Sequence, residues 1–157
     1  MPTPDLIHAT SADDLFALEG RELGPTRWVG IAQEQIDAFA ELTGDHQWIH
    51  TDPERAAASE FGSTVAHGLM TLAFGPMLMY ELIAFDGFAH ELNYGYEKVR
   101  FTAPLPVDSR VRMTATVVSV ARAGAGIKVV ARQIFEREGQ DRPVCVADAI
   151  ARVAEGD

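Results

Sequence analysis

Residues 65–85 are the stretch that most constrains the fold, because Glu81 is the only formally charged side chain in it. An apolar run of this length is compatible with a membrane span, but Gly75 and Pro76 interrupt it and His67 lies near its start. We therefore interpret it as a helix outside the membrane. An apolar helix in water must be buried nearly all round, so a sheet wrapped around it is the natural solution. Pro76 should kink the helix, because proline removes a backbone hydrogen bond.

The last third of the chain has the pattern of long strands. Apolar and polar side chains alternate along residues 110–121, which is typical of a strand with one buried face. Further strands are predicted at residues 92–101, 127–135 and 144–153, with turns at residues 124–126 and 138–141. Long strands joined by tight turns form an antiparallel meander.

Shorter elements are predicted before residue 65. Caps and apolar periodicity indicate three helices. The first covers residues 11–19 and is capped by Ser11, and the second covers residues 33–42 and is ended by Thr43 and Gly44. The third is a short helix through residues 56–58, which Asp52 and Pro53 begin. Residues 28–31 have the character of a short strand. This order predicts one α+β domain over residues 1–157, an antiparallel sheet with a helix along its inner face.

The distribution of charge and cysteine narrows the function classes. The net charge is −10, and residues 1–97 hold three basic and sixteen acidic side chains, which argues against a nucleic-acid partner. Cys145 is the only cysteine, so no internal disulfide forms and a reducing, cytoplasmic location is expected. Residues 1–5 have neither a basic start nor an apolar run, so we do not expect a secretory signal there.

Two short segments carry the residues with the clearest chemical potential. Asp45 and His50 stand five positions apart on a turn-rich stretch, and His67 and Gly68 precede the long apolar segment. We expect these two segments to face each other. A carboxylate and an imidazole that share one water molecule can move protons in both directions, since the ordinary pKa values of aspartic acid and histidine are about 3.9 and 6.5.

The spaced motif around these residues resembles a known family. Gly44-Asp45-x-x-x-Ile49-His50, Ala58-Ser59 and Ala66-His67-Gly68 are similar to the signature of the MaoC-like, (R)-specific enoyl-CoA hydratases. The full run from Thr43 to His50, together with Asn93-Tyr94-Gly95 and Lys98-Val99-Arg100-Phe101, resembles the NodN-like branch. The resemblance extends over nearly the whole chain. It implies the hot-dog fold, in which an antiparallel sheet wraps a long central helix.

The resemblance also implies an activity and a site. Members of the family add water reversibly to a trans-2-enoyl thioester of coenzyme A and form the (R)-3-hydroxyacyl thioester. Asp45 and His50 correspond to the catalytic dyad, and the backbone N–H of Gly68 to the donor that contacts the thioester oxygen. Glycine there would allow a close approach. No cofactor is implied, because coenzyme A is part of the substrate.

Other polar residues have two interpretations each. Gln47 and Asn93 either position the thioester or satisfy buried backbone groups, and Arg100 either meets the phosphates of coenzyme A or lies on a solvated strand face. His67 is expected to brace the loop through hydrogen bonds. His46 and His50 have the i,i+4 spacing of a metal pair, but their segment is turn-rich and lacks a third ligand at suitable spacing, so no metal is predicted.

Two alternatives to the hydratase stay open. The first is a hot-dog acyl-CoA thioesterase, for which the long helix offers Glu81 as the acidic residue. The second is a non-catalytic module that binds an acyl thioester. In each case a homodimer is expected, because a single hot-dog domain leaves a sheet edge and the ligand cleft incomplete. The sequence does not specify the acyl chain length or the metabolic pathway. It also does not specify whether the acyl carrier is coenzyme A or acyl carrier protein.

Overall fold

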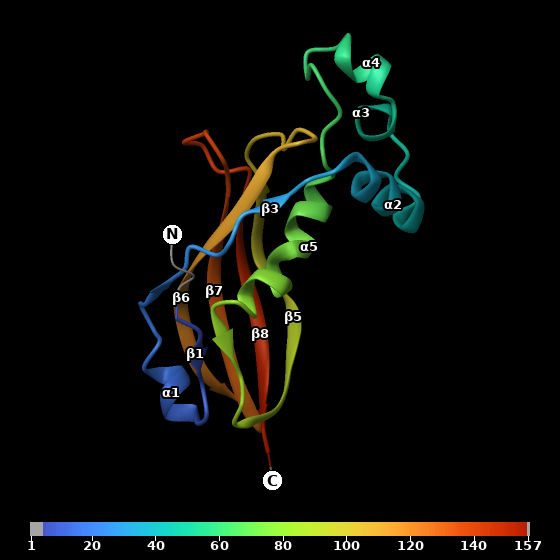
Figure 1. Cartoon of the computed structure of the whole chain (residues 1–157). Coiled ribbons are helices and arrows are strands. Elements are labelled where there is room, and N and C mark those ends of the chain that lie inside the picture. The colour runs from blue at the N-terminus through green and yellow to red at the C-terminus, as the bar shows by residue number, and fades with distance from the viewer. Residues whose placement is uncertain (1–4, 157) are drawn as a thin grey trace.

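An antiparallel sheet carries one helix along its face in the computed structural model, which describes residues 5–156 (Figure 1). The helix is α5 (Gly68–Met79). The sheet contains β2 (Glu22–Leu23), β3 (Val29–Gly30), β5 (Phe88–Phe101), β6 (Arg110–Ala123), β7 (Gly126–Arg137) and β8 (Cys145–Glu155). The predicted α+β architecture is therefore confirmed. Residues 1–4, which hold most of the stretch expected not to be a secretory signal, lie outside the described range.

The order of the strands differs from a simple meander. Strands β6, β7 and β8 are neighbours in sequence and in space, as predicted, but β5 pairs with β8 rather than with β6. The reason is the connection from β5 to β6, which leaves the sheet, buries Leu105 and forms an isolated bridge between Val65 and Pro106. As a result β5, which begins at Phe88 rather than at residue 92, is an edge strand.

Alternation along the strands builds the core. The inward side chains of β6 are buried, as the sequence pattern predicted, and they are Val111, Met113, Ala115 and Val117. Phe135 of β7 is also buried and lies against Gly75 of α5. From the helix, Met70, Leu72 and Leu78 join the same cluster. Burying each large apolar side chain contributes about 1.5–3 kcal/mol, so this layer holds the helix against the sheet.

The central helix is shorter than the apolar run that predicted it. Helix α5 has 12 residues and ends at Met79, and the run continues through a turn into β4 (Ile83–Ala84). Strand β4 pairs in parallel with β1 (Ile7–His8). A continuous apolar run does not distinguish a buried helix from a buried strand, which explains the error. Over residues 5–156, no helix is both long and apolar enough to cross a membrane.

One side of α5 is open, which contradicts the expectation of burial nearly all round. Large apolar side chains of α5 and of the residue after it are exposed. This open side lies next to β5, because Gly68 packs on the Phe101 ring and the Tyr80 hydroxyl donates to Glu91 at 3.3 Å. We call this surface the open apolar face, and it comprises Leu69, Met77 and Tyr80.

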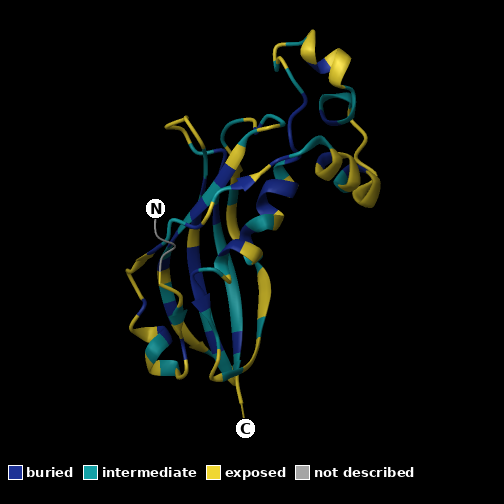
Figure 2. Ribbon diagram, in the orientation of Figure 1, coloured by how far each residue is buried: buried dark blue, intermediate teal, exposed yellow. Residues whose placement is uncertain are grey.

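Three short helices form an arm that projects from one end of the sheet, next to the start of α5 (Figure 1). They are α2 (Gln33–Thr43), α3 (Trp48–Thr51) and α4 (Pro53–Ala57); α2 and α4 are largely exposed, whereas α3 is half-buried (Figure 2). The predicted caps are confirmed: Gly44 ends α2 with φ of 75°, and the Asp52 carboxylate accepts a hydrogen bond from the Arg55 amide at 3.0 Å. Helix α3 was not predicted, because four residues are too few for a periodic pattern.

The N-terminal segment covers the opposite end of the sheet. Helix α1 (Ala12–Phe16) begins at the predicted cap Ser11, which forms a capping box with Asp14, and it ends three residues earlier than predicted. Leu15 and Leu18 bring this segment into the core. Just before β5 begins, Gly87 packs directly on the backbone of Thr10.

Replacing Gly87 with alanine tests this closure. The new Cβ would overlap the Thr10 carbonyl oxygen, so the N-terminal segment must shift. We expect Gly87→Ala to lower the free energy of unfolding by about 1–3 kcal/mol. Gly30→Ala is the matched control, because a Cβ at Gly30 meets nothing within 4 Å. Urea unfolding measures both, and equal midpoints for the two variants would contradict the packing described here.

Candidate active site

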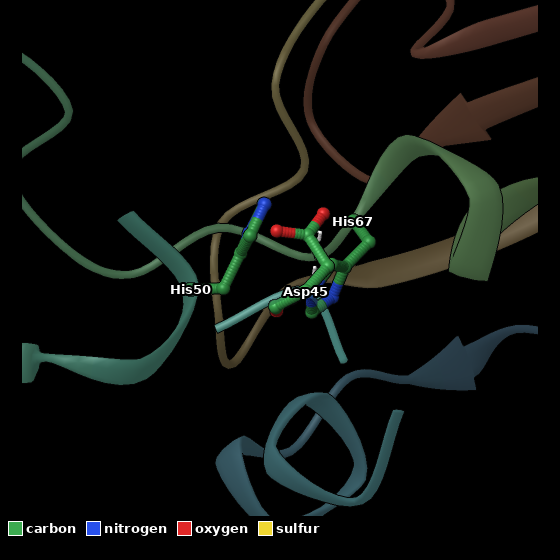
Figure 3. Close-up of side chains that lie close together, drawn as sticks. All are labelled: Asp45, His50 and His67. Atoms are coloured by element: carbon green, nitrogen blue, oxygen red, sulfur yellow. Dashed lines mark hydrogen bonds and ion pairs between the residues drawn. The ribbon is translucent and has the colours of Figure 1, made fainter. Parts of the chain in front are cut away.

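The arm brings Asp45 to the start of α5. Gly44 ends α2 in the left-handed conformation, so the chain turns at this point and Asp45 begins the loop to α3. The Gln47 amide donates to the Asp45 carboxylate at 3.4 Å, and the Asp45 side chain is 55% exposed. The carboxylate points toward the rings of His50 and His67 (Figure 3). This half-open position suits a group that exchanges protons with a ligand or with water.

His50 is buried at the base of the arm. Its Nδ1 lies 2.6 Å from the Val65 carbonyl oxygen. A carbonyl only accepts hydrogen bonds, so Nδ1 carries the proton and Nε2 keeps a lone pair. Burial lowers the pKa of His50 below its ordinary 6.5, and nearby His67 lowers it further, against the opposing effects of the Val65 hydrogen bond and Asp45. His50 is therefore neutral near neutral pH and able to accept a proton at Nε2.

His67 connects the two other residues. Its side chain is only 4% exposed, and its Nε2 donates to the Asp45 backbone carbonyl at 3.0 Å. Its ring also stacks on the ring of His50, with centroids 3.7 Å apart and an interplanar angle of 24°. The hydrogen bond to the loop that the sequence suggested is therefore present. The stacking on His50 was not foreseen.

The three side chains form one cluster. One ligand-type atom from each of Asp45, His50 and His67 lies within 4.8 Å of the others. Such a set could hold a metal ion, and sequence spacing missed it because His67 follows His50 by 17 residues. His46, the partner suggested by spacing, lies outside this cluster with its Nδ1 3.7 Å from Glu41. The proximity of Asp45 and His50 is observed, whereas their catalytic roles stay a prediction.

A cavity of about 350 Å³ opens beside the cluster. His50, Val65, Gly68, Thr71 and Phe101 are among the residues that line it. Gly68 is the first residue of α5, so its N–H has no partner within the helix and lies at the positive end of the helix dipole. A Cβ at this position would lie 2.7 Å from the Phe101 ring. Packing of Phe101 is thus a reason for glycine here that sequence reasoning missed.

The other predicted binding residues do not join this cavity. Gln47 lies exposed in the loop, and Arg100 is exposed with its Nη1 donating to the Val99 carbonyl at 2.7 Å. Asn93 lines a second cavity, beneath the C-terminal half of α5. Gln133 lines that second cavity too, and the sequence held a signal for it: a polar residue at an inward position of an alternating strand. The binding roles of Gln47, Asn93 and Arg100 stay predictions.

A sheet laid along one helix, with an aspartate and a histidine beside the start of that helix, matches the arrangement that the resemblance implied. The sequence profile described as MaoC like domain matches residues 16–138. That range is more than half of the chain, so the chain belongs to the MaoC-like family.

Individual relatives agree with this assignment. The chain is 49% identical over 143 residues to 3-hydroxyacyl-thioester dehydratase Z of Mycobacterium tuberculosis, covering 90% of this chain and 95% of that protein. It is 37% identical over 148 residues to nodulation protein N of Rhizobium meliloti, covering 92% of each. The solved structure of the (R)-hydratase PhaJ1 of Pseudomonas aeruginosa superposes with a TM-score of 0.72 at 18% identity, covering 94% of this chain and 88% of that one. This likeness confirms the predicted hot-dog fold.

The surroundings of His50 make its titration a direct test of the cluster. Nuclear magnetic resonance should give a pKa for His50 below 6.5. In His67→Asn that pKa should rise, because the variant removes a neighbouring ring that both lowers it and shields His50 from water. Since folding depresses this pKa, the unfolded chain binds more protons below pH 6.5, and stability should fall as the pH drops through that range.

His46→Asn is the control for this titration, because His46 is exposed and lies outside the cluster. It should leave the pKa of His50 unchanged. A pKa of His50 above 6.5, or one that His67→Asn lowers, would show that the cluster is arranged differently.

Proposed function

We propose that this protein is a hydro-lyase that adds water to trans-2-enoyl-CoA and gives (R)-3-hydroxyacyl-CoA, with dehydration as the reverse reaction. Family membership and the 49% identity to a 3-hydroxyacyl-thioester dehydratase support the class of reaction. The observation that carries the proposal is the pairing of a neutral His50, with its lone pair at Nε2, and the Asp45 carboxylate within 4.8 Å. Coenzyme A is the carrier that we propose.

Asp45 and His50 would hold one water molecule between them. The water oxygen bonds to C3 of the enoyl group while the dyad takes up one of its protons. A proton from the dyad then goes to C2, so that hydrogen and hydroxyl are added overall and the dyad returns to its starting state. The lowered pKa of His50 suits this cycle, because the imidazole must begin without a proton at Nε2.

Gly68 would stabilise the charge that develops on the thioester oxygen. Its N–H is the first in α5, and it lines the same cavity as His50. A donor fixed at the positive end of a helix stabilises such an oxygen without reorganising during the reaction. The Phe101 ring, packed against Gly68, would shield this contact from water.

The thioesterase alternative is less well supported. Glu81, the acidic residue that it requires, forms an ion pair with Arg27 at 2.7 Å and accepts a hydrogen bond from the Arg27 amide. It also lies after the C-terminal end of α5, whereas the His50 cavity is at the N-terminal end. Glu81 therefore serves to attach the Arg27 segment.

A cytoplasmic location is also part of the proposal. Cys145 is free and buried, and burial raises the pKa of its thiol to about 11. A thiol that stays protonated is a weak nucleophile and a poor partner for disulfide exchange. This fits a reducing compartment.

Substitution of the dyad tests the proposed reaction. Asp45→Asn and His50→Asn should each slow the loss of the enoyl-thioester ultraviolet band by about 10²–10⁴-fold, because each removes one proton-transfer group. Glu54→Gln, on the exposed surface of α4, is the control and should retain full activity. Full activity in Asp45→Asn would overturn the assignment of the dyad.

The same assay separates the alternatives. Release of free thiol from acyl-CoA without hydration would identify a thioesterase, and tight binding without turnover over several chain lengths would identify a binding module. Supplying the same enoyl group on coenzyme A and on acyl carrier protein identifies the carrier. We expect faster turnover with coenzyme A.

A homodimer is the proposed assembly. Strand β5 pairs only with β8 among residues 5–156, so its other edge is free over 14 residues. The open apolar face lies next to β5, since Gly68 packs on Phe101 and the Tyr80 hydroxyl donates to Glu91. An unpaired edge next to exposed apolar side chains favours pairing with another strand, and a second copy of β5 in a two-fold dimer satisfies both.

Light scattering tests this assembly. Wild-type protein should show twice the chain mass of 17.1 kDa, whereas Met77→Lys should shift the equilibrium to the monomer by placing a charge on the open apolar face. Val118→Lys, a similarly exposed apolar position on β6, should stay dimeric. A monomeric wild type, or an unchanged mass in Met77→Lys, would refute pairing through this face.

A further inference from the structure

Gln133 is an amide side chain in an otherwise apolar layer. It lies on β7 at an inward position between Ala131 and Phe135, and only 4% of it is exposed. Its Oε1 has no hydrogen-bond partner among the residues that the structure describes. A buried acceptor without a partner costs free energy. A donor that reaches this oxygen would offset that cost.

Gly75 provides the room for this amide. A Cβ at position 75 would lie 2.9 Å from the Gln133 Oε1. Helix α5 therefore approaches β7 closely at Gly75, where the amide stands between them. Both residues belong to the central layer of the fold, so the amide is held in place from both sides.

Gln133 lines the second cavity, which has a volume of about 50 Å³. The surrounding surface is mainly apolar and includes Leu15, Met79, Val117 and Val129. Glu91 and Tyr80 also line it, but they already bind each other, with the Tyr80 hydroxyl donating at 3.3 Å. A space of this size holds a few heavy atoms, so it fits the end of a chain rather than a whole acyl group.

The distance from the first cavity matches a medium-length acyl chain. Gly68 and Gly75 are seven residues apart on α5, which corresponds to about 10 Å along the helix axis. An extended chain of single bonds advances about 1.2 Å per atom, so about eight bonds lead from a thioester at Gly68 to the level of Gln133. The end of a ten-carbon chain would then lie in the second cavity.

We propose that the second cavity receives the tail of an acyl chain that carries a terminal hydroxyl group, and that this hydroxyl donates a hydrogen bond to the Gln133 Oε1. This inference rests on the proposed function and names its substrate class. A plain alkyl tail would leave the acceptor unpaired, and a carboxylate tail would bring a second acceptor to it beside Glu91. A hydroxyl is neutral, small and able to donate.

The test compares three substrates of the wild-type protein: crotonyl-CoA, trans-2-decenoyl-CoA and its ω-hydroxy derivative. We expect kcat/KM to be at least about tenfold higher for the hydroxylated chain than for the plain one, because a site built to pair a hydroxyl rejects the analogue without it. Equal values, a preference for the plain chain, or no turnover of either ten-carbon substrate would overturn the inference. If crotonyl-CoA is not hydrated either, the proposed function itself has failed.

Gln133→Leu tests whether the Gln133 amide causes the preference for the hydroxylated chain over the plain chain. In this variant the preference should disappear or reverse, whereas kcat/KM for crotonyl-CoA should stay within about twofold, since that short chain ends before the second cavity. Gln140→Leu, in an exposed turn, is the matched control and should keep the wild-type preference. A preference that survives in Gln133→Leu would show that another group, or a bound water, reads the hydroxyl.

Gly75→Ala gives an independent check if Gln133→Leu fails to fold. The added Cβ must displace the amide, so the preference for the hydroxylated chain should weaken while crotonyl-CoA is still hydrated. Thermal unfolding of each variant confirms that the comparison is made on folded protein. An unchanged preference in Gly75→Ala would contradict the placement of the amide.

Discussion

The contact between His67 and the arm is the interaction on which the site depends. Within the arm, the Gln33 side chain donates to the His50 carbonyl at 2.8 Å. His67 immediately precedes α5, and it contacts Asp45 by a hydrogen bond and His50 by stacking. The Val65 amide adds a bond to the Ile49 carbonyl at 3.0 Å. These contacts tie the positions of Asp45 and His50 to the start of the helix.

The same junction sets the protonation state of His50. Because the Val65 carbonyl accepts from Nδ1 of His50, the ring is fixed in the tautomer that keeps Nε2 free of a proton. Burial disfavours the charged form, and the stacked His67 acts in the same direction. Orientation, tautomer and charge of His50 thus follow from two neighbours, Val65 and His67, that sit on the same short segment before α5.

Local signals in the sequence were sufficient to predict the helix caps and the strands. Features that depend on contacts between distant residues were not predicted. Ser11, Gly44 and Asp52 act through residues within four positions, so the sequence alone predicted their roles. The motif likewise predicted that Asp45 and His50 would meet. The end of α5 at Met79 and the pairing of β5 with β8 depend on which apolar surfaces meet across the fold. The stacking of His67 and the packing of Phe101 on Gly68 are equally non-local.

Gly68 and Gly75 of α5 have different surroundings. In the proposed function this difference separates the site of the reaction from the site that selects the acyl tail. At Gly68 the helix offers an N–H without a partner in the helix, a positive dipole end and the His50 cavity, all of which would act on the thioester in the proposed reaction. At Gly75 it offers only space, which Gln133 fills with an unpaired acceptor. In the proposed function, a change at the second position would alter what the cavity accepts without touching the proton-transfer groups, because about two helical turns lie between them. Helix α5 would then act as a spacer between one pair of catalytic groups and substrates that differ only in their tails.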